Sequence, residues 1–117
     1  MSAPTLLSEH VWQPTEFPLC TVNVPMAQLA LRLGFPLAEW QESGLGNASG
    51  FSCKLPSGVV LLVEEFSHAR ARLGATGPTI YVEASALVAQ GVERLLSSVL
   101  TGLSLSPQNV TWSQDAA

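Results

Sequence analysis

The chain has 117 residues, a length that fits one domain built around one hydrophobic core. Hydrophobic residues make up 47% of it and charged residues only 12%, whereas soluble domains usually carry about 25% charged residues. Five basic and nine acidic residues give a net charge of −4, which disfavours binding to nucleic acid or to an anionic membrane surface.

The low charge also predicts apolar surface, which in soluble proteins usually marks contact with a partner or a second copy. The longest unbroken aliphatic run, residues 59–63, is far below the roughly 18 residues that span a bilayer, so we expect no membrane segment. The first residues lack the features of a secretory signal, and we expect a cytoplasmic protein. Cys20 and Cys53 are then expected to be free, buried thiols.

The first half of the chain predicts a strand followed by short helices. Residues 1–18 hold three prolines and favour an irregular N-terminal arm. Residues 19–24 alternate apolar and polar side chains, as a half-buried strand does. Residues 26–33 have helical apolar spacing and are followed by Gly34, which suits a helix end. A second short helix is expected after Pro36, ended by a flexible glycine-rich connector at 44–50.

The second half predicts a hairpin, a strand, a long helix and a last strand. Residues 51–55 and 59–66 flank turn residues and form the hairpin, its second strand apolar on both faces. A polar loop precedes a strand at 79–82. The main helix is expected from Ser85 to about Gly102, with the stripe from Val88 to Val99 mostly in the core and Gly91 allowing a close backbone approach.

Alternation around Val110 and Trp112 predicts the last strand, and residues 114–117 should fray. The order of elements indicates an α+β fold, with a mainly antiparallel sheet of four to five strands and one long and two short helices on one face. We expect a single domain over residues 19–113.

No pattern in the chain predicts catalysis, a cofactor or a metal. Glu64, Glu65 and His68 lie close together in sequence, but adjacent strand residues point to opposite faces, so we expect no metal site there. The glycines between 44 and 50 lack the spacing of a phosphate-binding loop, and no serine-nucleophile motif is present. We therefore expect a protein that is not an enzyme.

Residues 27–41 are weakly similar to a helix-turn-helix, with Gly34 at the turn. The second helix of that motif would carry Glu39 and Glu42 and no basic residue, which disfavours contact with DNA phosphates. Two short helices packed on a sheet are the favoured interpretation.

Three stretches resemble the small acidic chaperones of bacterial type III secretion systems and the chaperone-like Hrp regulators. They are Leu-Ala-Leu-Arg-Leu-Gly-Phe-Pro-Leu at 29–37, LPSGVVLLVEE at 55–65 and the helix at 85–102. The resemblance implies a non-catalytic protein that sequesters a secreted effector or a regulatory protein.

Our leading hypothesis is therefore a protein-binding module, with a homodimer left open. Contact is expected through strand edges or through the outer face of the main helix. The candidate contact residues are Leu37, Trp40, Arg70, Arg72 and Trp112. One alternative is an immunity protein that neutralises a toxin through an exposed acidic cluster of Glu39, Glu42, Glu64, Glu65 and Glu83. A second, less favoured alternative is a DNA-binding regulator.

Overall fold

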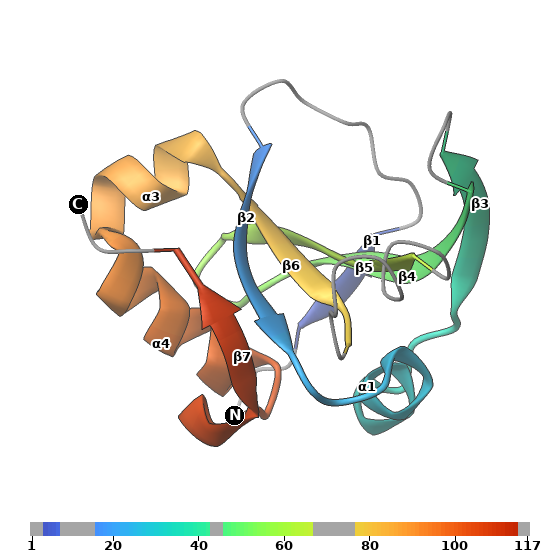
Figure 1. Ribbon diagram of the computed structural model, residues 1–117. Coiled ribbons are helices and arrows are strands. Elements are labelled where there is room, and N and C mark those ends of the chain that lie inside the picture. Colours follow the sequence, from blue (N-terminus) through green and yellow to red (C-terminus); the bar gives the residue numbers. More distant parts are fainter. Residues whose placement is uncertain (1–3, 8–15, 43–45, 67–76, 115–117) are drawn as a thin grey trace.

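Seven strands form one antiparallel sheet in the computed structural model, which describes residues 4–7, 16–42, 46–66 and 77–114 (Figure 1). The strands are β1 (Thr5–Leu7), β2 (Glu16–Val22), β3 (Ala38–Glu42), β4 (Gly46–Lys54), β5 (Val60–Phe66), β6 (Thr79–Glu83) and β7 (Val110–Ser113). Their order is β1-β4-β5-β6-β2-β7, and β3 pairs with β4 as well. The helices are α1 (Met26–Leu33), α3 (Ala84–Gln90), α4 (Val92–Gly102) and the short 3-10 helix η1 (Pro107–Asn109). The expected α+β class is confirmed, but among the described residues the sheet has seven strands, not the four to five expected.

The hairpin of β4 and β5 forms where the sequence predicts it. Its turn is held by Leu55 N–H donating to the carbonyl of Val59 and Gly58 N–H donating to that of Leu55, each at 2.8 Å. Leu61, Leu62 and Val63 of β5 are all buried, so both faces of this strand are covered, as its continuous apolar run indicates.

The prediction of a second short helix after Pro36 is wrong, because residues 38–42 form the strand β3. α1 ends at Gly34, which has a left-handed backbone (φ 74°), and Phe35 N–H donates to the carbonyl of Ala30 at 2.9 Å. After Pro36 the chain enters β3, which pairs with β4 from Ala38 opposite Gly50 to Glu42 opposite Gly46. The pairing also places residues 46–50, expected as a connector, inside β4, and no helix-turn-helix exists at 27–41.

The expected main helix is divided at Gly91 into α3 and α4. Gly91 has φ 80° and ψ 158°, a backbone conformation essentially confined to glycine. A side-chain carbon added there would meet nothing within 4 Å, so the conformation, and not a close approach, is what requires glycine. The break turns α3 relative to α4: Val88 is 87% exposed, which corrects its expected place in the core.

Part of the expected irregular arm belongs to the sheet. Thr5–Leu7 pairs with β4, and β2 starts at Glu16. The register of β2 against β6 shifts between Pro18 and Cys20, which allows the consecutive residues Leu19 and Cys20 to be fully buried in the same core.

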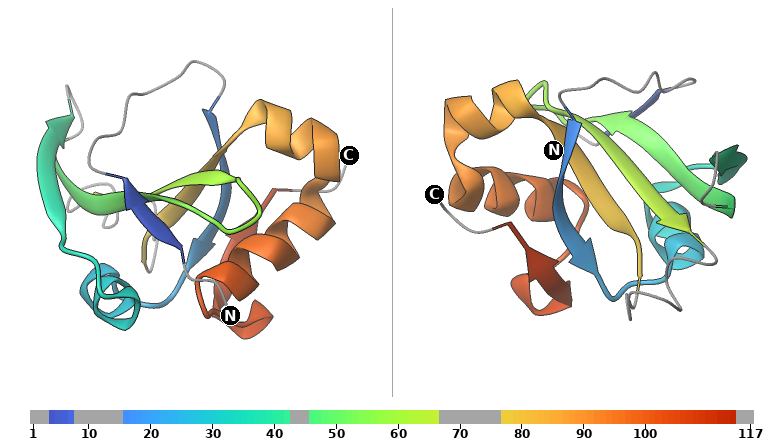
Figure 2. Two further views of the ribbon diagram at one scale, coloured as in Figure 1. Left: turned by 180° about the vertical axis from the view of Figure 1, so that it is seen from behind. Right: turned by 45° about the horizontal axis from the view of Figure 1, so that its top comes forward.

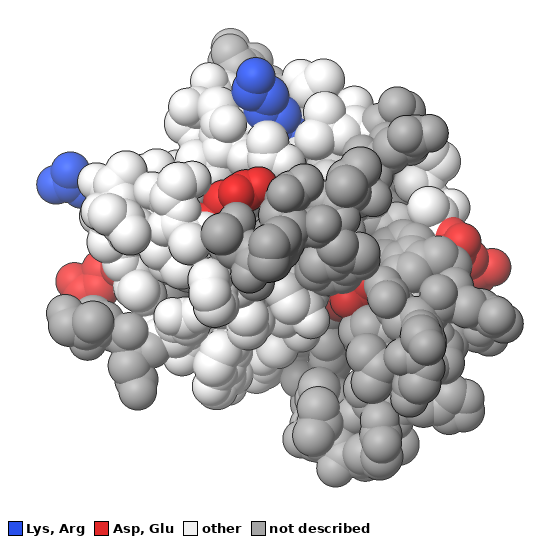
Figure 3. Space-filling model, turned by 90° about the horizontal axis from the view of Figure 1, so that it is seen from above, with Lys and Arg blue, Asp and Glu red and all other residues white. Residues whose placement is uncertain are grey.

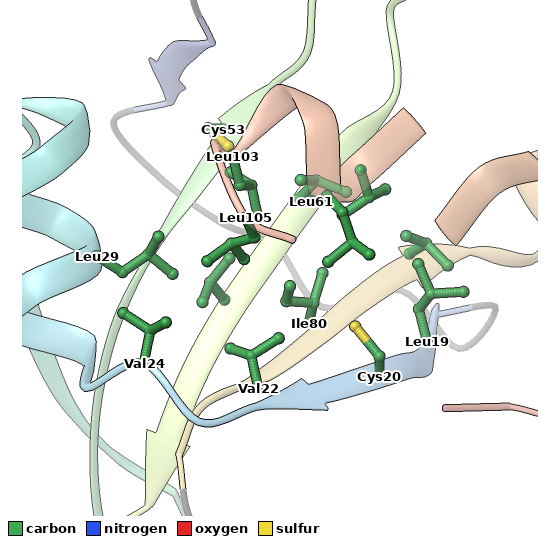
Figure 4. Packing of buried hydrophobic residues seen from close by; sticks show 14 of the residues in the cluster. Leu19, Cys20, Val22, Val24, Leu29, Cys53, Leu61, Ile80, Leu103 and Leu105 are labelled. Carbon is green, nitrogen blue, oxygen red and sulfur yellow. The ribbon is translucent and has the colours of Figure 1, made fainter. Parts of the chain in front are cut away.

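One face of the sheet carries the main core. α1 and α4 cover this face, as the packing of Leu29, Leu61 and Leu103 shows (Figure 4). α1 contributes Met26, Leu29 and Ala30, and α4 contributes Leu95, Val99 and Leu100. On the opposite face Ser52, Leu62 and Glu64 are buried as well.

Candidate protein-binding site

The structure does not bring the predicted contact residues together. Leu37, 41% exposed, directly precedes β3, which pairs with β4. Trp112, 48% exposed, lies on β7 at the far end of the sheet, with β5, β6 and β2 in between. The backbone of Trp40 pairs with Ala48, but its side chain is not described, and Arg70 and Arg72 lie outside the described residues.

A surface groove of about 430 Å³ lies between α4, η1 and β7. Figures 1 and 2 show α4 running beside β7. Five apolar residues line it: Leu96, Leu100, Leu105, Pro107 and Val110. Its polar lining consists of the exposed residues Glu93, Ser97 and Thr101. The apolar pattern of the sequence does not predict this groove, because Leu96 and Leu100 lie beside the core stripe on the same helix.

α4 can serve both the core and the groove because two apolar rows run along it. Leu95 and Val99 are fully buried in the core, whereas Leu96 is only half-buried. Residues four apart lie on the same side of a helix, so Leu96 and Leu100 form the adjacent row. The spacing of this second row is visible in the sequence, but it does not show whether the row meets the core or a groove.

The opposite wall of the groove is held by a turn after α4. Leu105 N–H donates to the carbonyl of Leu100 at 2.8 Å, which folds the chain back over the helix end. Ser106 N–H donates to Oδ1 of Asn109 at 3.0 Å, and Nδ2 of Asn109 donates to Oδ1 of Asn23 at 3.1 Å. Asn109 therefore ties η1 to the chain that leaves β2.

β7 is a sheet edge that pairs only with β2 among the described residues. Gln114 N–H donates to the carbonyl of Leu19 at 2.9 Å, and the hydroxyls of Thr21 and Thr111 lie 2.8 Å apart. Trp112 pairs with Thr21, whose neighbours in β2 face the core, so Trp112 faces away from α4. The four residues of β7 carry no charge.

The acidic residues whose side chains the structure describes do not form the exposed cluster that an immunity protein would use. Glu64 is 2% exposed, Glu65 and Glu83 are half-buried, and Glu39 is exposed. The side chain of Glu42 is not described. On the face drawn in Figure 3, the acidic side chains of the described residues lie at separate places.

The described residues contain no group of three His, Cys, Asp or Glu side chains placed to hold a metal ion. Glu64 pairs with Gly50 and Thr79 while Glu65 pairs with Ser49, so these two carboxylates lie on opposite faces of β5, as expected. His68 lies outside the described residues.

Cys20 and Cys53 are free and buried, as the sequence predicts. They lie on β2 and β4, with β5 and β6 between them (Figure 4). Three strand spacings of about 4.8 Å separate their backbones by roughly 14 Å, too far for a disulfide. Burial raises the pKa of each thiol to about 12, which keeps both protonated at neutral pH.

The fold and the groove define an α+β protein with an apolar groove beside an uncharged sheet edge. No family model, curated protein or solved structure matches the chain. Within the part of the chain that the structure describes, no helix is long and apolar enough to cross a membrane.

Proposed function

We propose that this protein is a non-catalytic binding module that holds a segment of another protein in the groove between α4 and β7. The observation that supports this is an open groove with an apolar lining and a polar rim, on a chain with few charges. Apolar surface of this kind is typical of protein-binding sites. By its resemblance to type III secretion chaperones and Hrp regulators, the expected partner is a secreted effector or a regulatory protein.

The alternatives have less support. The buried carboxylate of Glu64 cannot contribute to an exposed acidic surface, which weakens the immunity hypothesis. The strand at Ala38–Glu42 replaces the recognition helix that a helix-turn-helix regulator would need. A homodimer formed through the groove is one of the outcomes that the capture experiment distinguishes.

The experiment is capture of a partner by the tagged full-length protein in its native cell, followed by sizing of the complex by light scattering. The test variant is Ser97→Arg, which places a long charged side chain in the groove from an exposed position. The matched control is Val88→Arg, at an exposed position of α3 outside the groove. Thermal unfolding should show that both variants stay folded.

We expect the wild-type protein and Val88→Arg to capture the same single protein and Ser97→Arg to lose it. Capture that survives Ser97→Arg would place the binding surface elsewhere. A homodimer that Ser97→Arg dissociates, with no other protein captured, would show that the groove serves self-association.

A further inference from the structure

We propose that the occupant of the groove is an extended segment of a partner protein that adds to β7 as a further strand and carries a basic residue toward Glu93. This inference rests on the proposed function and specifies the chemistry of the bound segment. Addition of a strand to a sheet edge supplies main-chain hydrogen bonds, and pockets for alternate side chains supply specificity.

The edge at β7 suits such pairing better than the other described edges. Sheet edges are commonly protected by charged residues. β3 contains Glu39 and Glu42, and β1 has only three residues. β7 has no charged residue, and among the described strands it pairs with β2 alone, with a shift of register between Val110 and Trp112. Its outer side is therefore available in the part of the chain that the structure describes.

Apolar surface flanks this edge on both faces of the sheet. Val110 lines the groove beside Leu96, and Trp112 is exposed on the opposite face because the register of β7 against β2 shifts between these two residues. In an added strand, successive side chains would point alternately into the groove and toward Trp112. A helix in the groove would leave Trp112 without contact, so the two-sided apolar surface favours a strand.

The length of the groove along α4 also matches the length of a strand that pairs with β7. The lining of α4 runs from Glu93 to Thr101, a rise of about 12 Å in a helix. A strand of four residues covers roughly 13 Å. Two alternate side chains of such a strand would therefore lie along the helix within the groove.

Charge distinguishes a foreign segment from a second copy of this chain. Among the described residues that line the groove, Glu93 is the only charged one. A segment with Lys or Arg at the matching end would pair with it. A second copy would bring the same glutamate and a net charge of −4, so the complementary occupant is a basic, apolar segment of another protein.

The test is selection from a randomised dodecapeptide library on the full-length protein, with Ser97→Arg as the counter-selected protein. We expect peptides with alternating apolar residues and a basic residue. N-methylation of alternate backbone amides in a selected peptide should weaken binding by at least about tenfold at one set of positions and leave it unchanged at the other set. Glu93→Lys should in turn favour the same peptide with its basic residue replaced by glutamate.

The other outcomes contradict the inference in distinguishable ways. Peptides with apolar residues three and four apart, lost with Ser97→Arg but insensitive to N-methylation, would show that the groove binds a helix; the proposed function would then stand without the strand. If the peptides enriched without counter-selection all bind Ser97→Arg as well as the wild-type protein, both proposals are overturned. If no peptide is enriched over the Ser97→Arg protein, the strand proposal fails and the capture experiment alone decides the function.

Discussion

The rings of Phe35 and Phe51 meet edge to face, with centroids 5.2 Å apart and planes inclined at 69°. Phe35 follows the end of α1, and Phe51 is buried in the middle of β4. The contact holds the chain that leaves α1 against β4, so the next residues are positioned to pair as β3. Aromatic pairs in this geometry add stabilisation beyond the area they bury.

Removing the buried member of this pair should be the more costly change. We expect Phe51→Ala to lower the free energy of unfolding by about 3 to 5 kcal/mol, because it loses a buried ring and leaves a cavity. Phe35→Ala should cost less, because Phe35 is only half-buried. Urea unfolding of both variants measures this, and equal losses would contradict the assigned burial.

Gly91 and Gly34 should respond differently to asparagine. Gly34 has the ordinary left-handed conformation (φ 74°, ψ 25°), which asparagine tolerates. Gly91 (φ 80°, ψ 158°) lies in a region that only glycine occupies readily, where a side chain costs about 1 to 3 kcal/mol. Thermal unfolding should therefore show Gly34→Asn near wild type and Gly91→Asn clearly less stable. If Gly91→Asn is neutral, α3 and α4 do not break as described.

The turn that forms one wall of the groove should depend on Asn109. We expect Asn109→Ala to lower the free energy of unfolding by about 1 to 2 kcal/mol, since it removes the bonds to Ser106 and Asn23. The matched control is Gln108→Ala, an exposed neighbour in the same turn, which should change little. Similar losses for the two variants would show that the side-chain bonds of Asn109 do not hold the turn.

The buried thiols should make stability fall at alkaline pH. The pKa of Cys20 and of Cys53 is raised from 9.0 to about 12 in the folded protein. Between pH 9 and 12 the unfolded thiols therefore lose protons that the folded protein keeps, and the free energy of unfolding decreases as pH rises. Urea unfolding should show a shallower decrease above pH 9 for the Cys20→Ala/Cys53→Ala variant. A thiol reagent should leave native protein unlabelled at pH 8, and rapid labelling would contradict the burial.

Several elements follow from local residues alone. Apolar spacing over Met26–Leu33 with Gly34 after it specifies α1, and Pro56 to Gly58 between two apolar runs specifies the hairpin. β6 and β7 appear within a residue or two of their predicted bounds. These signals need no distant partner, because turn chemistry and side-chain periodicity act over a few residues.

The candidate site was less accessible from the sequence. Trp112 was predicted as a contact residue and is exposed, but Leu37 lies at the other side of the sheet. The periodicity of α4 predicts a core position for Leu96, because a helical stripe of leucines has the same spacing whether it packs against a sheet or lines a groove. Only the tertiary position of the turn at Asn109, beside α4, shows that Leu96 lines a groove.

By itself, the sequence determined the α+β class, the hairpin and the helix α1, because each depends on contacts between residues near in the chain. Tertiary structure decided that Ala38–Glu42 is a strand, since β4 offers it backbone hydrogen bonds that outweigh a weak helical preference. It also decided that Leu95 is enclosed in the core whereas Leu96 lines a groove, because burial depends on what the rest of the chain packs against each face of the helix.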